Sequence, residues 1–289
     1  NPTEVRILFL SLIMSIVIEP LVNEPAVRVE NTIRVLVLAD LHLGIEWDIH
    51  NNSGIVIPSQ SDKGLTRVLQ YIDTIKPDRI VLLGDIKHNI PWISWQEREE
   101  IPYFLDRISQ KASVDIVPGN HDGDMEQLIN LMPDPSHITL RPVKGFVLDN
   151  VGYFHGHTWP ALELLSCKHI LMAHNHPTIR FTDTLGHSSA EPAWIRTSMD
   201  HQPLEEHYRI NKTQMQWSDP EVIIIPAFCE LCGGAAFNES FHEDLLGPVF
   251  SSKAINLDKG EAYLLDGTRL GTLNELRKIN RHDRQSQSP

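Results

Sequence analysis

Five short apolar runs in this sequence each end directly in a cluster of polar, metal-binding residue types. The runs are rich in Val, Ile and Leu, have the length of buried strands, and cover residues 33–38, 80–83, 114–117, 151–154 and 170–172. Between the first three runs, apolar residues recur at helical spacing from Leu65 to Ile75 and from Ile101 to Ile108. Strands that alternate with helices predict an α/β fold. Further apolar runs at 137–140, 145–148, 178–181, 222–225 and 262–265 predict a second half that is richer in strands.

The first two polar clusters contain carboxylates that suit metal binding. Asp40 and His42 follow the first run, and because alternate side chains of an extended chain point the same way, they can bind one cation together. Gly84 and Asp85 follow the second run. Glycine lets the backbone turn closely, and the two oxygens of a carboxylate can bridge two metal ions. We therefore expect Asp85 to be able to bridge two ions.

The other three clusters are rich in histidine. Asn120 and His121 follow the third run, where the amide oxygen of the asparagine can bind a metal and the neighbouring ring can donate a proton. Ligands of open α/β sheets bind at the carboxyl ends of the strands, so all five clusters are expected at one edge. The last two runs end in His155-Gly156-His157 and in His174-Asn175-His176.

The donor types in these clusters indicate which metals the site takes. Asp, Asn and His, with no Cys among the expected ligands, suit borderline divalent ions such as Mn, Fe, Zn, Ni or Co. Two such ions about 3.5–4 Å apart can clamp a phosphoryl group and share a water that is nucleophilic near neutral pH. The clusters therefore predict a hydrolase.

The ordered blocks resemble the calcineurin-like metallophosphoesterases, whose pattern runs D-x-H, G-D, G-N-H-[DE], H and G-H-x-H. Every block is present in order from Asp40 to His176, with Ala173 where the family has glycine. Residues 39–44, 84–88 and 266–268 are similar to an archaeal and bacterial subgroup associated with DNA ligase or with a large helicase. The resemblance implies a four-layer sandwich in which helices flank two mixed β-sheets.

The resemblance also implies a role for each site residue. The shared ligand would be Asp85, the proton donor His121, and the residue that orients its ring Asp122. His155 is preferred as a ligand over His157, although the sequence does not separate them, and His157 is then expected to contact substrate. His88 is also expected to contact substrate if Ile86 starts a helical turn that places His88 on the same face as Asp85, and is otherwise a surface residue. One ion would be bound by Asp40, His42 and His176, and the other by Asn120, His155 and His174.

We expect a hydrolase that cleaves phosphoester bonds with two divalent ions, with Mn as the first choice. The subgroup resemblance points to DNA as substrate and to a helicase or DNA ligase partner. The chain has 25 basic and 38 acidic residues, a net charge of −13, which favours instead a phosphodiesterase or phosphatase for a small nucleotide-like substrate. A non-catalytic module that holds a phosphate or a partner is a third possibility, but an intact His121 argues against it.

The remaining expectations concern the ends of the chain and its cysteines. We predict an N-terminal extension over 1–18, the enzyme domain over 19–272 and a polar tail over 273–289, with Met14 as a hypothetical natural start that makes 1–13 an over-extended beginning. The apolar stretch 7–18 is too short to span a bilayer and has the wrong flanks for a secretion signal. Three cysteines fit a reducing interior, so a cytoplasmic protein is expected. Cys229 and Cys232 are expected in an apolar turn, because a structural zinc would need Cys167 and His242 as well.

Overall fold

The central strands of the fold are apolar on both faces, so other elements must pack against both sides of each strand. In β3 (Arg34–Ala39), Leu36 and Leu38 pack among the residues of the first helices, while Val35 and Val37 pack against the second sheet. Alternate residues of a strand face opposite sides, so one strand contributes to two separate cores. The same division occurs in β9 (His169–Met172), where Ile170 and Met172 face the C-terminal helices.

The computed structural model, which describes residues 16–183 and 185–286, contains a six-stranded sheet in the order β1-β2-β3-β4-β5-β6. β3 to β6 are parallel, whereas β1 and β2 are antiparallel to their neighbours. The carboxyl ends of β3, β4 and β5 therefore lie at one edge. The strands not yet given are β1 (Val17–Pro20), β2 (Ala26–Glu30), β4 (Arg79–Leu83), β5 (Ser113–Val117) and β6 (Ile138–Leu140).

The second sheet has the order β14-β13-β11-β12-β9-β8-β7, and β10 pairs with β11 off this path. It is mixed, because β8, β9 and β12 are parallel while the other pairs are antiparallel. Its strands are β7 (Phe146–Leu148), β8 (Val151–Tyr153), β10 (Thr178–Thr182), β11 (Ser188–Ser198), β12 (Glu221–Ile224), β13 (Glu261–Leu264) and β14 (Arg269–Thr272).

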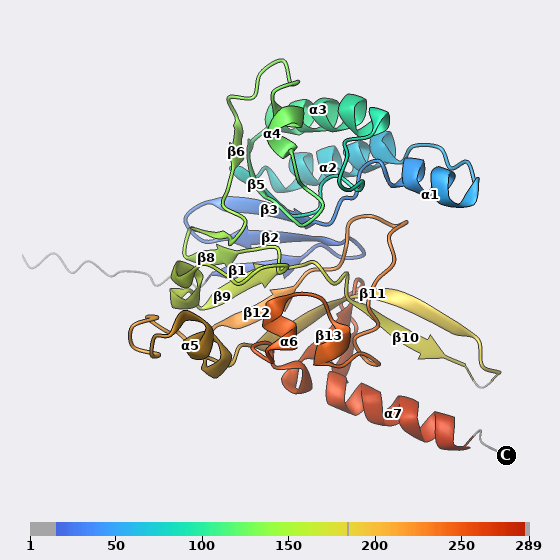
Figure 1. The fold of residues 1–289 in the computed structure, drawn as a ribbon, viewed down its shortest axis with the longest axis vertical. Coiled ribbons are helices and arrows are strands. Elements are labelled where there is room, and N and C mark those ends of the chain that lie inside the picture. Colours follow the sequence, from blue (N-terminus) through green and yellow to red (C-terminus); the bar gives the residue numbers. More distant parts are fainter. Residues whose placement is uncertain (1–15, 184, 287–289) are drawn as a thin grey trace, which may run out of the picture.

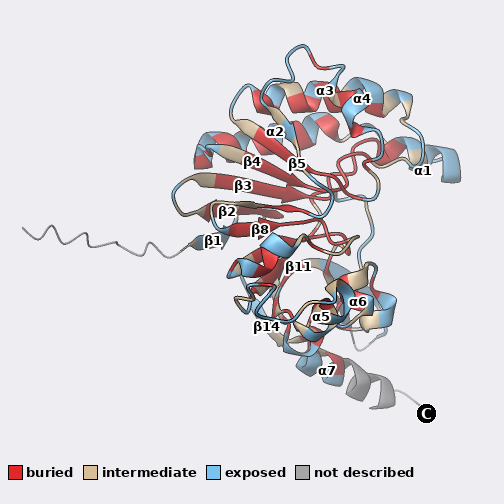
Figure 2. Cartoon of the chain, turned by 60° about the vertical axis from the view of Figure 1, so that its left-hand side comes forward, coloured by how far each residue is buried: buried red, intermediate tan, exposed pale blue. Residues whose placement is uncertain are grey.

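Helices cover the outer face of each sheet, which completes four layers (Figure 1). Buried residues fill the strands between the helical layers (Figure 2). The predicted α/β fold of two mixed sheets flanked by helices is confirmed. The first sheet is covered by α2 (Ser61–Ile75), α3 (Trp95–Ser109) and α4 (Met125–Ile129), while α1 (Ile45–Ser53) projects to the side of this layer (Figure 1). The second sheet is covered by α5 (Gln202–Tyr208), α6 (Pro248–Ser251), α7 (Leu273–Ser286) and the short 3-10 helices η1 (Leu162–Ser166) and η3 (Leu257–Lys259), and a third short helix, η2 (His242–Asp244), lies beside α6.

The ends of the domain differ from the sequence prediction. The segment predicted as a polar tail forms α7, because Leu273 and Leu276 pack onto the second sheet's core and the buried Arg277 pairs with Asp258 at 3.2 Å. Of the predicted N-terminal extension, residues 17 and 18 belong to β1, while residues 1–15, including Met14, lie outside the described residues. Within the described part of the chain, no helix is long and apolar enough to cross a membrane.

Candidate metal centre

The predicted polar clusters meet where the two sheets present their strand ends. The loops after β3 and β4 are joined by backbone hydrogen bonds: Asp40 N–H donates to the Gly84 carbonyl at 3.1 Å, and His42 N–H donates to the Asp85 carbonyl at 2.8 Å. From the second sheet, the His155 ring reaches Asp40, with Nε2 2.9 Å from Oδ1. Side chains from both sheets therefore line a single site.

One group of donor atoms in this site comes from Asp40, His42, Asp85 and His176, whose ligand atoms all lie within 4.8 Å of one another. Nε2 of His42 is 3.2 Å from Nε2 of His176 and 3.8 Å from Oδ2 of Asp85. Nε2 of His176 is 3.6 Å from Oδ1 of Asp40. Two ligand atoms that each lie about 2.1 Å from one ion are separated by at most about 4.2 Å, so these separations suit a shared cation.

A second group of donor atoms comes from Asp85, His155 and His174, again within 4.8 Å of one another. Nε2 of His155 is 3.7 Å from Oδ2 of Asp85. Nδ1 of His174 is buried and has no hydrogen-bond partner among the described residues. An orphaned buried ring nitrogen is costly unless something binds it, so these side chains fit a divalent metal ion. Asn120, the remaining predicted ligand, lies exposed in the bend that follows β5.

Burial keeps the rings of two predicted ligands, His42 and His174, uncharged, which suits metal binding. It lowers the pKa of His42 to about 2 and the pKa of His174 to about 3. Both rings are therefore neutral near pH 7, the form that binds a metal. Burial acts in the same direction on His176, but attraction to Asp40 outweighs it and raises the pKa of His176 to about 9. Burial raises the pKa of Asp40, but attraction to His176 and hydrogen bonds from the neighbouring rings lower it overall.

The backbone at the site is left-handed, which differs from the extended chain that the alternate spacing predicted. Positive φ values cost about 1–3 kcal/mol in most residues and persist only where the surroundings impose them. The turns therefore aim the side chains, rather than the simple alternation of a strand. The φ angles are 52° at Asp40, 45° at His42, 46° at Asp85, 81° at His174 and 43° at His176.

Two glycines allow the ligand side chains to approach the backbone. A Cβ at Gly119 would overlap Oδ1 and the backbone nitrogen of Asp85, and a Cβ at Gly84 would overlap the His155 ring. Gly84 also has a φ of 81°. No larger residue fits either position without moving a predicted ligand.

The ring of the predicted acid His121 is held differently from our expectation. Nδ1 of His121 donates to the carbonyl of His88, and the backbone N–H of His121 donates to Oδ1 of Asp85 at 2.9 Å. Because a carbonyl only accepts, Nδ1 carries the hydrogen and Nε2 remains to exchange a proton. Nε2 lies 4.0 Å from Oδ2 of Asp85. The ring is therefore oriented by a backbone carbonyl.

Asp122, predicted to orient that ring, binds the backbone of two loops instead. Its carboxylate accepts hydrogen bonds from the backbone N–H groups of Ile86 at 2.8 Å, Lys87 at 3.1 Å and Gly119 at 2.8 Å. Burial, together with repulsion from Asp85, raises the pKa of Asp122 to about 6. Asp122 thus joins the loop after β4 to the loop after β5.

The two histidines predicted to contact substrate lie beside predicted ligands. Nδ1 of His88 is 3.2 Å from Nδ1 of His42, and Nε2 of His88 is 3.6 Å from Oδ2 of Asp48. Nδ1 of His157 is 3.0 Å from Nδ1 of His155, whose Nε2 faces the carboxylates. This geometry supports His155 rather than His157 as the ligand, and both His88 and His157 contact the ring of a ligand on its far side.

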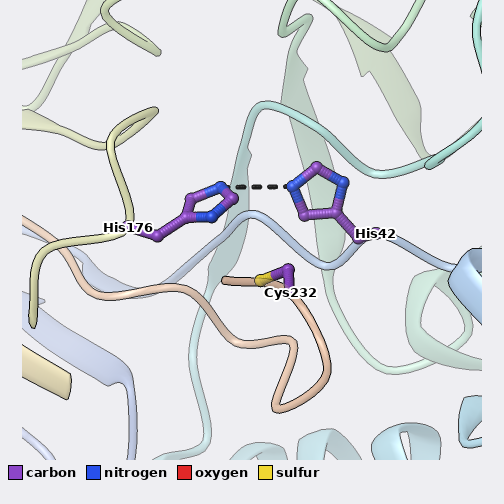
Figure 3. A group of neighbouring side chains, drawn as sticks. All are labelled: His42, His176 and Cys232. Atoms are coloured by element: carbon purple, nitrogen blue, oxygen red, sulfur yellow. Dashed lines mark hydrogen bonds between the residues drawn. The ribbon is translucent and has the colours of Figure 1, made fainter. Parts of the chain in front are cut away.

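The sequence prediction missed Cys232. Its sulfur and ring nitrogens of His42 and His176 lie within 4.8 Å of one another. Figure 3 shows the three side chains gathered at one place. The expected turn is present, but it packs against the site. Neither Cys167 nor His242 joins Cys232 in a metal-binding group within the described residues. The available signal was a pair of cysteines separated by two residues, but the neighbours of Cys232 in space are histidines distant in sequence.

The model of the family described as calcineurin-like phosphoesterase matches residues 33–229, a span that includes every predicted site residue. The chain belongs to the calcineurin-like phosphoesterase family. The phosphoesterase is accordingly a metal-dependent hydrolase of phosphoester bonds, which confirms the predicted family and reaction class.

Several chains of known structure are similar to this one, including the following three. The phosphoesterase is 16% identical to Pseudomonas putida nuclease MPE over 86% of this chain and 98% of that one, with a TM-score of 0.46. It is 17% identical to YfcE, a phosphoesterase from E. coli, over 52% and 73% of the two chains, with a TM-score of 0.32. It is also 17% identical to AQ665 from Aquifex aeolicus, a protein of unknown function, over 49% and 78%, with a TM-score of 0.34. No curated protein matches the chain.

Proposed function

We propose that the phosphoesterase uses two divalent metal ions to hydrolyse a phosphodiester. The observation that carries this proposal is that Asp85 belongs to both donor groups, as a bridging carboxylate must. Asp40, His42 and His176 would hold one ion with it, and Asn120, His155 and His174 the other. When bound, two such ions would supply charge that attracts the phosphoryl oxygens and lowers the pKa of a shared water. Mn is the first choice of metal, and Fe, Zn, Ni and Co suit the same donors.

In this proposal His121 supplies the proton to the leaving oxygen. Its Nδ1 is committed to the His88 carbonyl, so only Nε2 can give the proton. His121 is half-buried beside Asp85 and keeps access to a substrate at the mouth of the site. Asp122 contributes indirectly, because it fixes the loops that carry Asp85 and His121.

We propose DNA as the substrate, with a helicase or DNA ligase as partner in the same reaction sequence. Besides the subgroup resemblance, two tryptophans support a nucleic acid: Trp92 is 78% exposed and Trp95 is 71% exposed, in and just after the loop that begins at His88. Exposed aromatic rings stack on the bases of single-stranded nucleic acid.

A small nucleotide-like substrate is favoured instead by the ion pairs that basic side chains make with acidic residues of the chain. The densest basic stretch of the chain runs from Arg269 to Arg284, but Arg269 pairs with Glu261 at 2.5 Å and Arg277 is buried against Asp258. These pairings and a net charge of −13 disfavour the binding of a long polyanion. A small diester needs only the metal ions.

A substrate panel separates these proposals. Single-stranded, double-stranded and gapped DNA, RNA, a small aryl diester and a monoester are each assayed with Mn, Zn, Ni and Mg. Cleavage of single-stranded or gapped DNA that exceeds cleavage of the small diester supports the nuclease, and hydrolysis of small diesters alone supports the second candidate. Asp85→Asn is the matched control, since it removes the bridging charge while keeping the shape; unchanged turnover in that variant overturns the two-metal proposal.

A further inference from the structure

We propose that Cys232 is an additional, sulfur ligand of the metal ion held by Asp40, His42 and His176. The inference rests on the proposed function, because it concerns the metal centre of that function. It adds a soft donor to a set that otherwise consists of carboxylates and imidazoles. The expected consequence is a site that binds Zn, Co or Fe more tightly than carboxylates and imidazoles alone would.

The position of the sulfur carries the proposal. Cys232 lies below the gap between the His42 and His176 rings, whose Nε2 atoms face each other at 3.2 Å (Figure 3). The sulfur and both rings form a group with ligand atoms within 4.8 Å of one another, and the two rings are shared with the group of Asp40 and Asp85. A cation bound between the two rings would therefore have the sulfur next to it.

The loop that carries Cys232 is fastened to the metal-binding loop after β3. Backbone N–H groups of Phe228 and Cys229 donate to the carbonyls of Ala39 at 2.9 Å and Asp40 at 3.1 Å. These two hydrogen bonds join the segment just before Cys232 to the backbone at the proposed ligand Asp40. The start of the loop that carries Cys232 is therefore held against the metal site.

The end of the same loop is fastened to the metal-binding loop after β9. Nδ1 of His176 donates to the Gly233 carbonyl at 2.8 Å, which leaves Nε2 as the metal-binding nitrogen. The backbone N–H of Ala235 donates to the Asn175 carbonyl at 3.1 Å. A Cβ at Gly234 would overlap the carbonyl oxygen of His176, so the two loops are in close contact. Cys232 thus lies in a loop built against two of its proposed co-ligands.

Cys229, three positions before Cys232, is not part of the proposed metal site. Cys232 Sγ lies 3.2 Å from the carbonyl of Cys229, a weak hydrogen bond for a thiol. Cys229 belongs to none of the metal-binding groups among the described residues.

When Cys232 binds the ion, its S–H bond breaks, the electron pair stays on sulfur and forms the bond to the metal, and the proton leaves to solvent. No oxidant or reductant takes part.

Cobalt provides the test, because a thiolate bound to Co²⁺ gives a near-ultraviolet charge-transfer band that oxygen and nitrogen ligands do not give. We expect the full-length protein loaded with Co²⁺ to show this band, Cys232→Ser to lose it, and Cys229→Ser to keep it. Cys232→Ser is also expected to weaken Zn²⁺ or Co²⁺ binding by about 10–100-fold while Mn²⁺ binding changes less. A Co²⁺-loaded wild-type protein without the band overturns the proposal, as does equal loss of the band in both serine variants.

The same spectra separate this inference from the proposed function. The visible bands of bound Co²⁺ report metal binding by any ligand set. If visible bands appear without the charge-transfer band, the metal centre stands and the Cys232 ligand is refuted. If no Co²⁺ or Zn²⁺ binds at all, the proposed metal centre itself fails. Because the wild-type spectrum decides both points, the test does not depend on the folding of a variant.

Discussion

Replacing Gly119 by alanine tests the geometry of the bridging carboxylate. The added Cβ would overlap Oδ1 and the backbone nitrogen of Asp85 and would lie 2.8 Å from its Cγ, where an ordinary contact begins at 3.4 Å. Cγ alone must therefore move by about 0.6 Å, and Oδ1 by more, because overpacked atoms can relax only by shifting. The hydrogen bond from the His121 N–H to Oδ1, now 2.9 Å, is also disturbed.

The size of the effect follows from this displacement. Overpacking costs about 1–3 kcal/mol of folding stability, and a catalytic group misplaced by about 1 Å can cost about 100-fold in rate. We therefore expect Gly119→Ala to lower the free energy of unfolding modestly and turnover of a chromogenic phosphodiester by about 100-fold. Urea unfolding and steady-state kinetics with saturating metal measure the two quantities separately.

Gly123→Ala is the matched control. Gly123 lies in the same loop, and a Cβ there would meet no heavy atom of the described residues within 4 Å. We expect its free energy of unfolding to stay within about 0.5 kcal/mol of wild type and its turnover within about twofold, since substitutions at exposed positions without close contacts have small effects. If Gly119→Ala turns over substrate as fast as Gly123→Ala, Asp85 is not held against this loop and the reasoning is refuted.

Three further predictions concern the acid, the metal and the fold. His121→Ala should keep metal content near normal by elemental analysis and slow turnover by about two to four orders of magnitude, and loss of metal would identify it as a ligand instead. Because attraction to Asp40 overcomes burial and raises the pKa of His176 to about 9, metal binding must displace a proton from this ring below that pH. Metal affinity in titrations should therefore rise at least about tenfold per pH unit up to about 9, with a steeper rise where Cys232 also releases its proton, and a flat profile would contradict the proton competition. Asp115, which is buried, binds Arg79 and Arg141 at 2.7 Å each, so Asp115→Asn should reduce the free energy of unfolding by about 1–3 kcal/mol, less than for a fully buried pair because the arginine side chains are 28% and 30% exposed. An unchanged midpoint in urea would show that this pairing contributes nothing.

The strands that carry the site were predictable because their signal is local. The runs before Asp40, Asp85 and Asn120 became β3, β4 and β5, since an uninterrupted apolar run buried on both faces needs no distant information to be recognised. β11 was not predicted, because its polar first half and Pro192 read as a loop. It forms a strand because its neighbours on both sides supply hydrogen bonds.

Six of the seven predicted ligands, all except Asn120, lie in groups of neighbouring donor atoms, but the backbone geometry that brings them together was not predictable from their spacing. The left-handed turns at Asp40 and His174 depend on loops that lie far apart in sequence, and the close approaches at Gly84 and Gly119 appear only when the loops are packed together. The partner of His121 changed from the adjacent Asp122 to the carbonyl of His88 for the same reason.

From the order and type of its residues alone, the chain disclosed a layered α/β fold and which carboxylates and imidazoles gather at the strand ends, because both are written in short stretches. Only the folded chain brought Cys232 beside His42 and His176 and turned the C-terminal segment into a packed helix. Those outcomes depend on the order of strands in the sheets and on contacts between loops far apart in sequence, and no short stretch of sequence contains that information.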